Sequence, residues 1–441
     1  MTVLIKIIQL LLSLSILVIV HEFGHFVLAR YFKTRVEKFY LFFDWPFALF
    51  KHKWGETEYG IGMIPLGGYV KIAGMIDESM DREQMKQPPQ PYEFRSKKAW
   101  QRLLIMLGGV IFNFIFALMI YVCVLSIWGE TYLPAANVKY GILTDSTGYA
   151  MGFRNGDKII SVDGAPVDNF YTIIPDVLLN DRKVITVDRQ GTRVDIPISR
   201  EFIPKLLKNP DILDARIPFG PFVVSDFADD SPAKNAGMAV GDEIVALDSI
   251  PFVWYNEFQG YLASHKGTPM TVTVKRGNEL VDFKVRTTEA GFLGVLREAG
   301  NVLKLSTKHY SFFQAIPAGI SKGWKTTRDY LKQFRLIFAK HTKAYESLGG
   351  FIAIGNIFPG IWNWQAFWNL TAFLSLILAV MNILPIPALD GGHVMFLIFE
   401  VVTGKKPSDK FMEYAQIVGM IILFALLIFA NGNDILKLIR K

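Results

Sequence analysis

Cysteine is almost absent from this chain, since Cys123 is its single thiol. No disulfide can form within the chain, and a zinc site made of several thiolates is excluded. Charge is also scarce at the start, where an apolar run extends from about Val3 to Tyr31 and Lys6 is its one charged residue before position 21. No small-residue cleavage site follows the first part of this run, so we expect a retained membrane span rather than a signal peptide.

The composition is that of a membrane protein with soluble parts. Of 441 residues, 51% are hydrophobic and 20% are charged, and the mean hydropathy is +0.28. Several domains are expected at this length. The net charge is +7, but no stretch combines a basic face with a nucleic-acid-binding signature. We therefore expect no nucleic-acid partner, and assign the excess cations to the headgroups of a lipid bilayer.

Three further segments are long enough to cross a hydrocarbon core of about 30 Å, at roughly 103–128, 366–386 and 411–430. Lysines and arginines follow the first span, precede the second and lie between the third and fourth. The positive-inside rule places these loops in the cytoplasm, so both termini and the insert between spans two and three are expected outside. The basic C-terminal tail argues the other way, but late charges weigh less than the first helix.

The first span contains the sequence His21-Glu22-Phe23-Gly24-His25. Histidines four apart share one helix face and can bind a single Zn²⁺, and Glu22 is then placed to activate a water molecule. An ionised carboxylate within a span costs roughly 2.5 to 3.5 kcal/mol on insertion scales, which favours a functional role. The alternative is a histidine pair that only contacts a neighbouring helix.

A third metal ligand should come from the cytoplasmic end of another helix. The third span ends there with Asn382 and the sequence I-L-P-I-P-A-L-D-G-G, in which two prolines interrupt the helix and two glycines let Asp390 approach a metal. Two histidines and an aspartate with one open position are typical of catalytic zinc sites. The alternatives are an ordinary Asp-Gly turn and, for Asn382, a bond to a neighbouring helix instead of a role at the scissile carbonyl or its oxyanion.

These two motifs, in this order and leaflet, resemble those of the site-2 protease family of intramembrane zinc metalloproteases. The resemblance implies that His21, His25 and Asp390 bind one zinc ion, that Glu22 is the general base, and that Asn382 binds substrate or stabilises the transition state. The four spans and the large insert resemble the bacterial branch of the family.

The chain departs from the family pattern at two places. Residues 41–46 replace a Gly-Phe-Gly-Pro-like segment, and Gly109-Val110 stands where relatives often carry Gly-Pro before the asparagine that matches Asn113. We expect these departures to change local loop geometry and not the chemistry.

The insert contains a repeat in which Gly152 and Gly237 begin equivalent Gly-x₃-Gly-Asp segments, each leading into a short apolar strand. The two copies resemble tandem PDZ domains, which bind peptides by strand addition or by holding a terminal carboxylate. The candidate ligand-loop residues are Gly156, Asp157, Gly241 and Asp242. The alternatives are another small β-rich module, or a bulky gate that binds no peptide.

Two other segments bear on mechanism. Residues 57–71 read as two short strands about a Pro-Leu-Gly-Gly turn. By resemblance this is a membrane-reentrant hairpin whose edge captures an unwound substrate, with Gly67, Gly68 and Tyr69 in contact with it; an ordinary cytoplasmic hairpin is the alternative. Residues 304–343 carry nine lysines or arginines and one acid, and predict an amphipathic helix on the outer membrane surface or a basic helix packed on the protein.

We therefore predict a polytopic α-helical membrane protein with four transmembrane helices, a membrane-associated β-hairpin and two inserted extracytoplasmic PDZ domains of mostly β structure. The expected parts are an N-terminal membrane region, two PDZ domains, a basic connecting region and a C-terminal membrane region, at 1–133, 134–205, 214–296, 297–365 and 366–441.

The resemblance implies a multi-pass protease of the bacterial cytoplasmic (inner) membrane that cuts single-span proteins near their cytoplasmic end. Its substrates would be anti-sigma-factor-like proteins after a first extracytoplasmic cut, with remnant signal peptides as a further class. A non-catalytic zinc-binding scaffold or a metal transporter, with PDZ domains that recruit partners, is the alternative. Glu22 argues against it, because a carrier needs no base beside its ligands.

Overall fold

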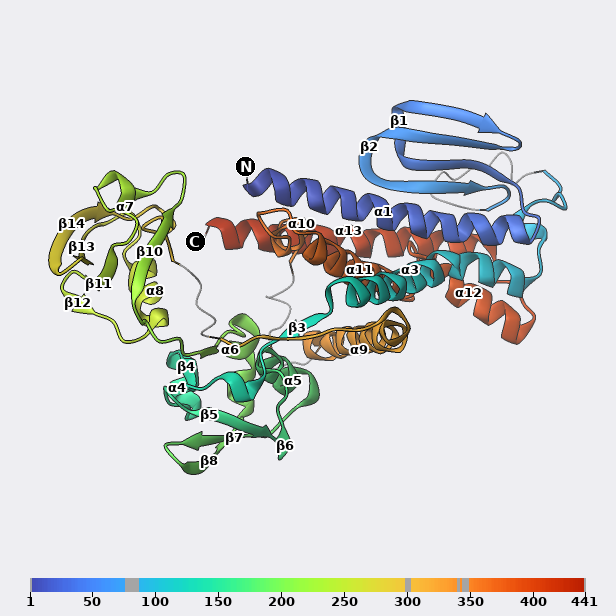
Figure 1. Ribbon diagram of the computed structural model, residues 1–441. Coiled ribbons are helices and arrows are strands. Elements are labelled where there is room, and N and C mark those ends of the chain that lie inside the picture. The colour runs from blue at the N-terminus through green and yellow to red at the C-terminus, as the bar shows by residue number, and fades with distance from the viewer. Residues whose placement is uncertain (1, 76–86, 298–302, 339–341, 343–348, 440–441) are drawn as a thin grey trace. The chain divides into compact units, whose positions relative to one another are not determined.

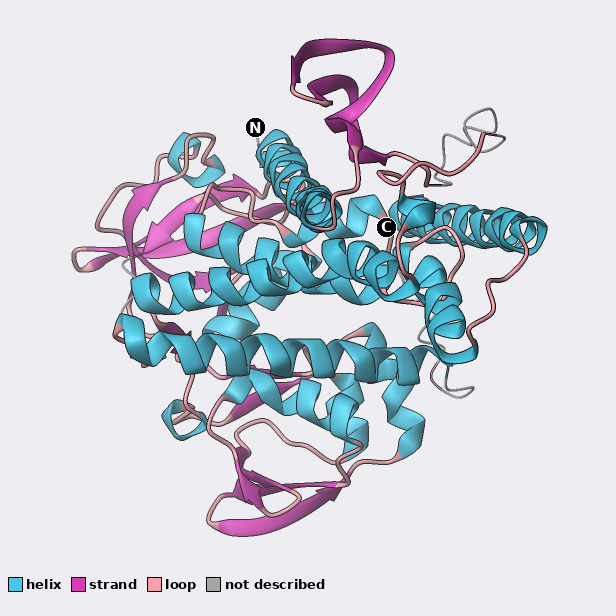
Figure 2. Cartoon of the chain, turned by 90° about the vertical axis from the view of Figure 1, so that its right-hand side faces the viewer, coloured by secondary structure: helices cyan, strands magenta, loops and turns pink. Residues whose placement is uncertain are grey.

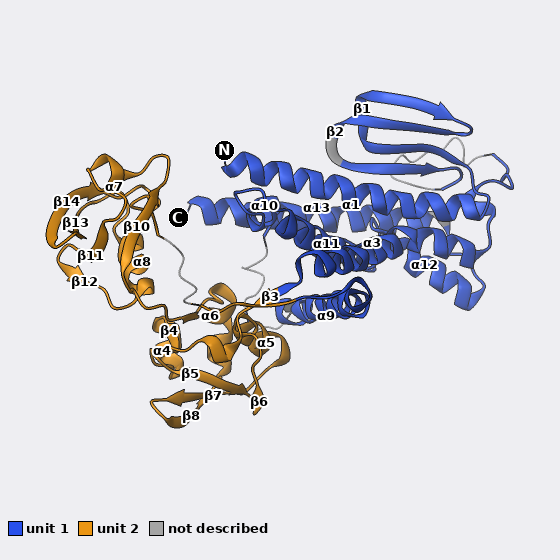
Figure 3. Ribbon diagram, viewed as in Figure 1, with its two compact units in different colours: residues 1–130, 309–441 blue, residues 131–308 orange. Residues whose placement is uncertain are grey.

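The computed structural model describes the chain apart from residues 1, 76–86, 298–302, 339–341, 343–348 and 440–441 (Figure 1). Part of the predicted connecting region 297–365 therefore lies outside the described residues. The chain divides into two compact units (Figure 3). One comprises Met1–Glu130 and His309–Lys441, and the other comprises Thr131–Lys308.

Four helices of the described chain are long and apolar enough to cross a membrane, as predicted. They are α1 (Thr2–Tyr31), α3 (Ala99–Trp128), α11 (Trp364–Asn382) and α13 (Asp409–Ile439). Helix α11 is shorter than the predicted third span, because the chain turns after Asn382. Pro385 and Pro387 lack the N–H groups that a continued helix would need.

Helices α1, α3 and α11 pack side by side in the first unit (Figures 1 and 2). The backbones of α1 and α3 touch, since a Cβ atom on Gly24 would lie 2.3 Å from the Gly108 carbonyl oxygen. Small residues allow this approach in a membrane, where contact rather than water exclusion holds helices together. Helix α11 joins α1 through a buried hydrogen bond of 3.0 Å between the Thr371 and Ser13 hydroxyls.

Three further helices complete this unit, namely α9 (Phe312–Phe338), α10 (Phe351–Ile357) and α12 (Asp390–Thr403). Helix α9 runs antiparallel along α3, with Gly319 against Val122 and Gly323 against Leu118. Helix α12 was not predicted, and Asp390 is its first residue.

The strand pair β1 (Val36–Trp54) and β2 (Thr57–Ile72) forms a sheet that stands beside α1 (Figure 2). Both strands bend, so that Tyr40 on β1 is in register with both Tyr69 and Gly60 on β2, while Phe50 is in register with Ile61. The two halves of β2 pair with the same segment of β1, since Tyr40 is in register with Gly60 in one half and Tyr69 in the other. The chain therefore turns within β2, in agreement with the predicted pair of short strands in 57–71. Strand β1 was not predicted, because its sequence carries the turn residues Asp44 and Pro46.

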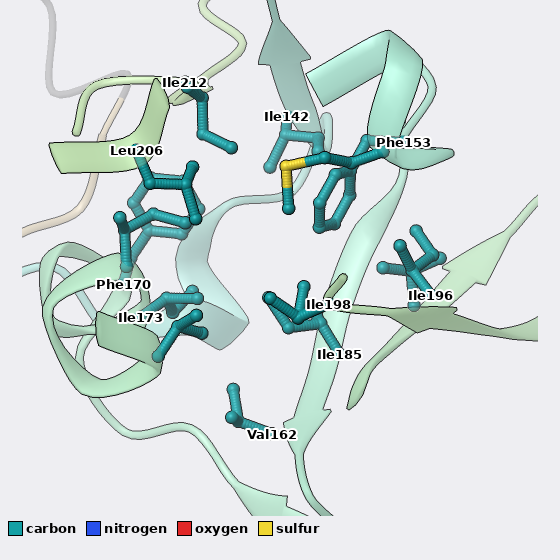
Figure 4. Close-up of a cluster of buried hydrophobic side chains, with 14 of the residues drawn as sticks. Ile142, Phe153, Val162, Phe170, Ile173, Ile185, Ile196, Ile198, Leu206 and Ile212 are labelled. Atoms are coloured by element: carbon teal, nitrogen blue, oxygen red, sulfur yellow. The ribbon is translucent and has the colours of Figure 1, made fainter. Parts of the chain in front are cut away.

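The second unit begins with a module built around a four-stranded sheet of order β6-β5-β7-β8 and a separate pair, β4 with β9. Buried isoleucines, valines and phenylalanines from these strands and from α5 and α6 fill its core (Figure 4). The elements are β4 (Ile142–Thr144), α4 (Ser146–Met151), β5 (Lys158–Val162), β6 (Ala165–Pro166), α5 (Ile173–Asn180), β7 (Val184–Arg189), β8 (Thr192–Pro197), α6 (Ile203–Lys208) and β9 (Leu213–Ala215).

The following module has a sheet of order β14-β13-β11-β10-β15, with β12 paired to β11, and its own core. Its elements are β10 (Phe222–Phe227), α7 (Pro232–Asn235), β11 (Glu243–Leu247), β12 (Ile250–Pro251), α8 (Tyr255–Ser264), β13 (Pro269–Arg276), β14 (Glu279–Arg286) and β15 (Val295–Arg297). The unit starts and ends in a short ladder of β3 (Glu130–Tyr132) with β16 (Ser306–Lys308).

Candidate metal centre

Three side chains from α1 and the start of α12 converge on one point. The Nε2 atoms of His21 and His25 lie 3.1 and 3.3 Å from Asp390 Oδ2, and 3.3 Å from each other. Of the described residues, these three form the group whose ligand atoms could hold a single metal ion. The structure thus brings Asp390 next to His21 and His25, although it follows His25 by 365 residues in the sequence.

The spacing fits a zinc ion. Nitrogen and oxygen ligands lie about 2.0 to 2.1 Å from zinc, so two ligand atoms of a tetrahedral site are roughly 3.3 to 3.4 Å apart. The three measured separations are 3.1 to 3.3 Å. In addition, Asp390 Oδ2 is buried, and its polar neighbours among the described residues are these two imidazole nitrogens. When neither Nε2 atom carries a proton, the buried carboxylate charge is costly unless a cation binds it.

Helix α3 fixes the orientation of one imidazole. His25 Nδ1 lies 2.9 Å from the backbone oxygen of Ile105, and His25 is 6% exposed. A proton on Nδ1 satisfies this carbonyl and leaves the Nε2 lone pair directed at the centre, as is usual for metal-binding histidines.

Glycines of α3 make room for both rings. A Cβ atom on Gly109 would lie 2.4 Å from His21 Cε1 and 2.6 Å from His25 Nε2. No side chain other than hydrogen fits at this position. In the sequence, Gly109 stands out only as the residue before Val110, where relatives often carry Gly-Pro, and its contact with the two rings depends on the packing of α3 against α1.

The segment before Asp390 has an unusual backbone. Ala388 has φ of +145°, a conformation that costs a residue with a side chain free energy and that often occurs at functional sites. The two glycines after Asp390 lie against the backbone of the preceding loop. A Cβ atom on Gly391 would lie 2.1 Å from the Leu384 oxygen, and one on Gly392 would lie 2.5 Å from Pro387 Cα. They let the first turn of α12 pack on the preceding loop.

The remaining predicted residues of the HExxH and Asn motifs also lie at this centre. The Glu22 carboxylate lies within electrostatic range of His25, His21 and Asp390, and it faces the backbone of Val70 on β2. Asn382 Nδ2 lies 3.4 Å from His21 Nε2 and 3.5 Å from its Nδ1. A carboxylate and an amide are therefore adjacent to the three converging atoms of His21, His25 and Asp390.

The hairpin residues lie beside α1, on the segment that leads to Val70. Gly68 is so close to this helix that a Cβ atom would lie 2.8 Å from Val18 Cγ1, and Gly67 has φ of +139°. The Tyr69 ring is stacked on Tyr40, with 5.5 Å between the ring centroids. The structure thus places Gly68 next to α1, while the contacts of the Tyr69 ring are with its own sheet.

The repeat residues of the second unit form two equivalent ion pairs. Arg189 donates two hydrogen bonds to Asp157, at 2.8 and 2.7 Å, and Arg276 donates two to Asp242, at 2.7 and 2.8 Å. Each aspartate is 1% exposed. The Arg276 hydrogen bond holds the pKa of Asp242 below its ordinary value. The two arginines were missed, although each stands at the end of a strand in its copy of the repeat.

The glycines that precede these two aspartates have the same backbone conformation in both copies of the repeat. Gly156 and Gly241 have φ of +93° and +95°, a region that favours glycine. These four residues, predicted as ligand-loop candidates, therefore form two tight turns, and the aspartate of each turn is bound by the arginine of its own module.

Comparison with known proteins gives a consistent result. Residues 9–426 of the chain match peptidase family M50. A protein of Neisseria meningitidis named as a zinc metalloprotease is 27% identical over 448 residues, which cover 97% of this chain and 98% of the relative. A Rickettsia conorii protein with a similar name is 28% identical over 440 residues, covering 98% and 99%. The regulator of sigma-E protease of Salmonella typhimurium is 27% identical over 455 residues, covering 97% and 98%.

Proposed function

The chain belongs to peptidase family M50 and is a membrane zinc metalloprotease, and on this premise we propose that His21, His25 and Asp390 bind its zinc ion while Glu22 serves as the base. The observation that carries the proposal is the convergence of two Nε2 atoms and one carboxylate oxygen within 3.3 Å of one another. These are the ligand types that zinc prefers in a catalytic site.

The residues around the proposed zinc site have separate roles in peptide hydrolysis. Zinc bound by these three ligands supplies a Lewis acid that activates water and polarises the scissile carbonyl. Glu22 takes the proton from the attacking water and gives it to the leaving amine, which is why it must lie beside the ligands and not among them. The Asn382 amide, next to His21, donates a hydrogen bond to the carbonyl oxygen as negative charge develops on it.

Because the proposed zinc site lies on membrane-spanning helices, its substrate should be a membrane-spanning segment. A helix hides its peptide bonds behind its own hydrogen bonds, so a spanning substrate must unwind before attack. We propose that the unwound segment pairs with β2 at Gly67, Gly68 and Tyr69. The close approach of Gly68 to Val18, one helical turn before His21, supports this assignment. A strand held there would pass the base and the ligands.

We propose the remaining assignments from the relatives and the charge pattern. The protein lies in a bacterial inner membrane, cuts single-span proteins of the anti-sigma-factor type after an outer cut, and accepts remnant signal peptides. Both termini and the second unit are extracytoplasmic. The modules 134–205 and 214–296 are PDZ domains that either bind new peptide termini through the turns at Gly156-Asp157 and Gly241-Asp242 or act as a gate.

Two substitutions test the site in purified protein. Glu22→Gln should leave one zinc per chain and reduce cleavage of a single-span substrate in detergent by about 10²-fold to 10⁴-fold. Asp390→Asn should lower zinc occupancy as well as cleavage. Glu130→Gln, a matched change outside the site, should alter neither. Cleavage by the Glu22 variant at the unchanged rate would refute the base, and full zinc occupancy in the Asp390 variant would remove that ligand.

A further inference from the structure

Asn113 on α3 contacts Nδ1 of His21, while Asp390 contacts the other ring nitrogen, Nε2. Its amide nitrogen lies 3.4 Å from His21 Nδ1, and the residue is fully buried. Its Oδ1 atom accepts no hydrogen bond from the described residues. A buried amide oxygen without a donor is costly, so this side chain calls for a physical explanation.

The partner of the second histidine supplies a comparison. His25 Nδ1 faces the Ile105 carbonyl oxygen, which can only accept, so the proton of this ring is held on Nδ1. Ile105 and Asn113 lie on the same helix, two turns apart, and each faces one of the two histidines. A histidine that binds a cation through Nε2 carries its proton on Nδ1 and needs an acceptor there. For His21, no such acceptor has yet been assigned.

Two side chains of the described chain reach His21 Nδ1, and their geometry differs. The Asn382 nitrogen is 3.5 Å from Nδ1 and 3.4 Å from Nε2, so it is nearly equidistant from the two ring nitrogens. Asn113 contacts Nδ1 alone. Its backbone is held as well, because the Ser375 hydroxyl of α11 donates to the Asn113 carbonyl at 2.8 Å. Asn113 is thus the group aimed at this nitrogen.

We propose that Asn113 is a positioning residue whose Oδ1 accepts the Nδ1 proton of His21 and so holds the Nε2 lone pair toward the metal. The two ends of an amide have nearly the same shape, so a half-turn of the side chain exchanges Oδ1 and Nδ2 within the same space. When the His21 proton is on Nε2, facing Asp390, Nδ2 donates to Nδ1. When Nε2 binds a cation, Oδ1 accepts from Nδ1. The inference rests on the proposed ligand set.

The test is the zinc affinity of the purified full-length protein, measured by competition with a chromophoric chelator. Asn113→Leu and Asn113→Ala remove the acceptor and should weaken zinc binding by about 10-fold to 100-fold, the usual effect of losing such a partner. Asn113→Asp keeps the acceptor and should bind zinc at least as tightly as the unchanged protein. Ser126→Ala removes a hydroxyl from the same helix, where it bonds to the Cys123 carbonyl at the surface, and should leave the affinity unchanged.

Each result decides between hydrogen bonding and packing. If the Leu and Ala variants bind zinc as tightly as the unchanged protein, or if the Asp variant is as weak as they are, the proposal is wrong. A ¹⁵N spectrum of histidine-labelled, zinc-loaded protein should show a protonated Nδ1 on His21, and a deprotonated one would also overturn it. His21→Ala distinguishes a failure of the Asn113 proposal from a failure of the ligand set. Full zinc occupancy in this variant would refute the ligand set itself, whatever the Asn113 variants show.

Discussion

Arg102 on α3 donates a hydrogen bond of 2.5 Å to Glu400 on α12, and the two side chains are 10% and 16% exposed. Helix α12 begins with Asp390, so this pair ties the far end of the carboxylate-bearing helix to α3. The same α3 holds His25 through Ile105 and contacts His21 through Asn113. One helix therefore positions residues from both ends of the chain around a common point.

Breaking this ion pair should weaken the metal centre from a distance. Arg102→Met leaves the Glu400 carboxylate without its partner, and loss of one member of a buried pair typically costs about 3 to 5 kcal/mol. We expect lower stability in detergent and a lower zinc affinity, because Asp390 is no longer held in place. The double variant Arg102→Met with Glu400→Met should be less impaired than the two single changes predict together. Strict additivity of the unfolding free energies would show that the pair is not coupled.

The close approach of α3 to the histidines gives a second prediction. Gly109→Ala introduces a Cβ atom within 2.6 Å of His25 Nε2 and within 2.4 Å of His21 Cε1, so the rings must move. We expect a loss of zinc binding with a smaller loss of helix packing, since α3 itself tolerates alanine. Gly432→Ala on α13, where nothing lies within 4 Å, is the control and should bind zinc normally. Equal zinc content in the two variants would contradict the predicted crowding.

The spans were predictable from sequence because a bilayer requires about 20 consecutive apolar residues in each of them. The histidine pair and Glu22 were predictable for a related reason, since polar residues inside such a run are costly and stand out. Strand β1 was not predictable, because its pairing with β2 depends on contacts between segments and its sequence carries turn residues such as Asp44 and Pro46. Helix α12 was hidden by the prolines and glycines around Asp390, which indicate a loop.

The supporting contacts of the site could not be found from the sequence. Asn113, Gly109 and the Ile105 carbonyl act through packing of α3 against α1, and no spacing along the chain reveals it. Arg189 and Arg276 could have been found, since each closes the same strand in the two copies of the repeat. The copies differ by an insertion there, so a search at one fixed offset misses the pair.

The second module should lose stability in acid. The Arg276 hydrogen bond lowers the pKa of Asp242 from its ordinary value of 3.8. A carboxyl group whose pKa is lower in the folded state stabilises that state above its unfolded pKa, and this contribution is lost as the pH falls through the folded value. Arg276→Gln should therefore speed hydrogen exchange of β11 and β13 at pH 7, and the difference from the unchanged protein should shrink as the pH falls below 3.8 and through the lowered pKa of Asp242. A difference that does not depend on pH would exclude the ion pair as its cause.

The insert can be removed with little disturbance to its ends, which gives a test of the proposed gate. Strands β3 and β16 pair, and the Thr131 and Thr307 hydroxyls lie 3.0 Å apart, so a short Gly-Ser linker can replace residues 133–305. If the insert excludes substrates by size, this variant should cut a single-span substrate whether or not a folded outer domain is attached. If the modules instead capture a new terminus, the deletion should slow cleavage of the trimmed substrate. Glu22→Gln in the shortened chain should abolish both activities, and untrimmed substrate that stays intact while trimmed substrate is cut normally would contradict both roles.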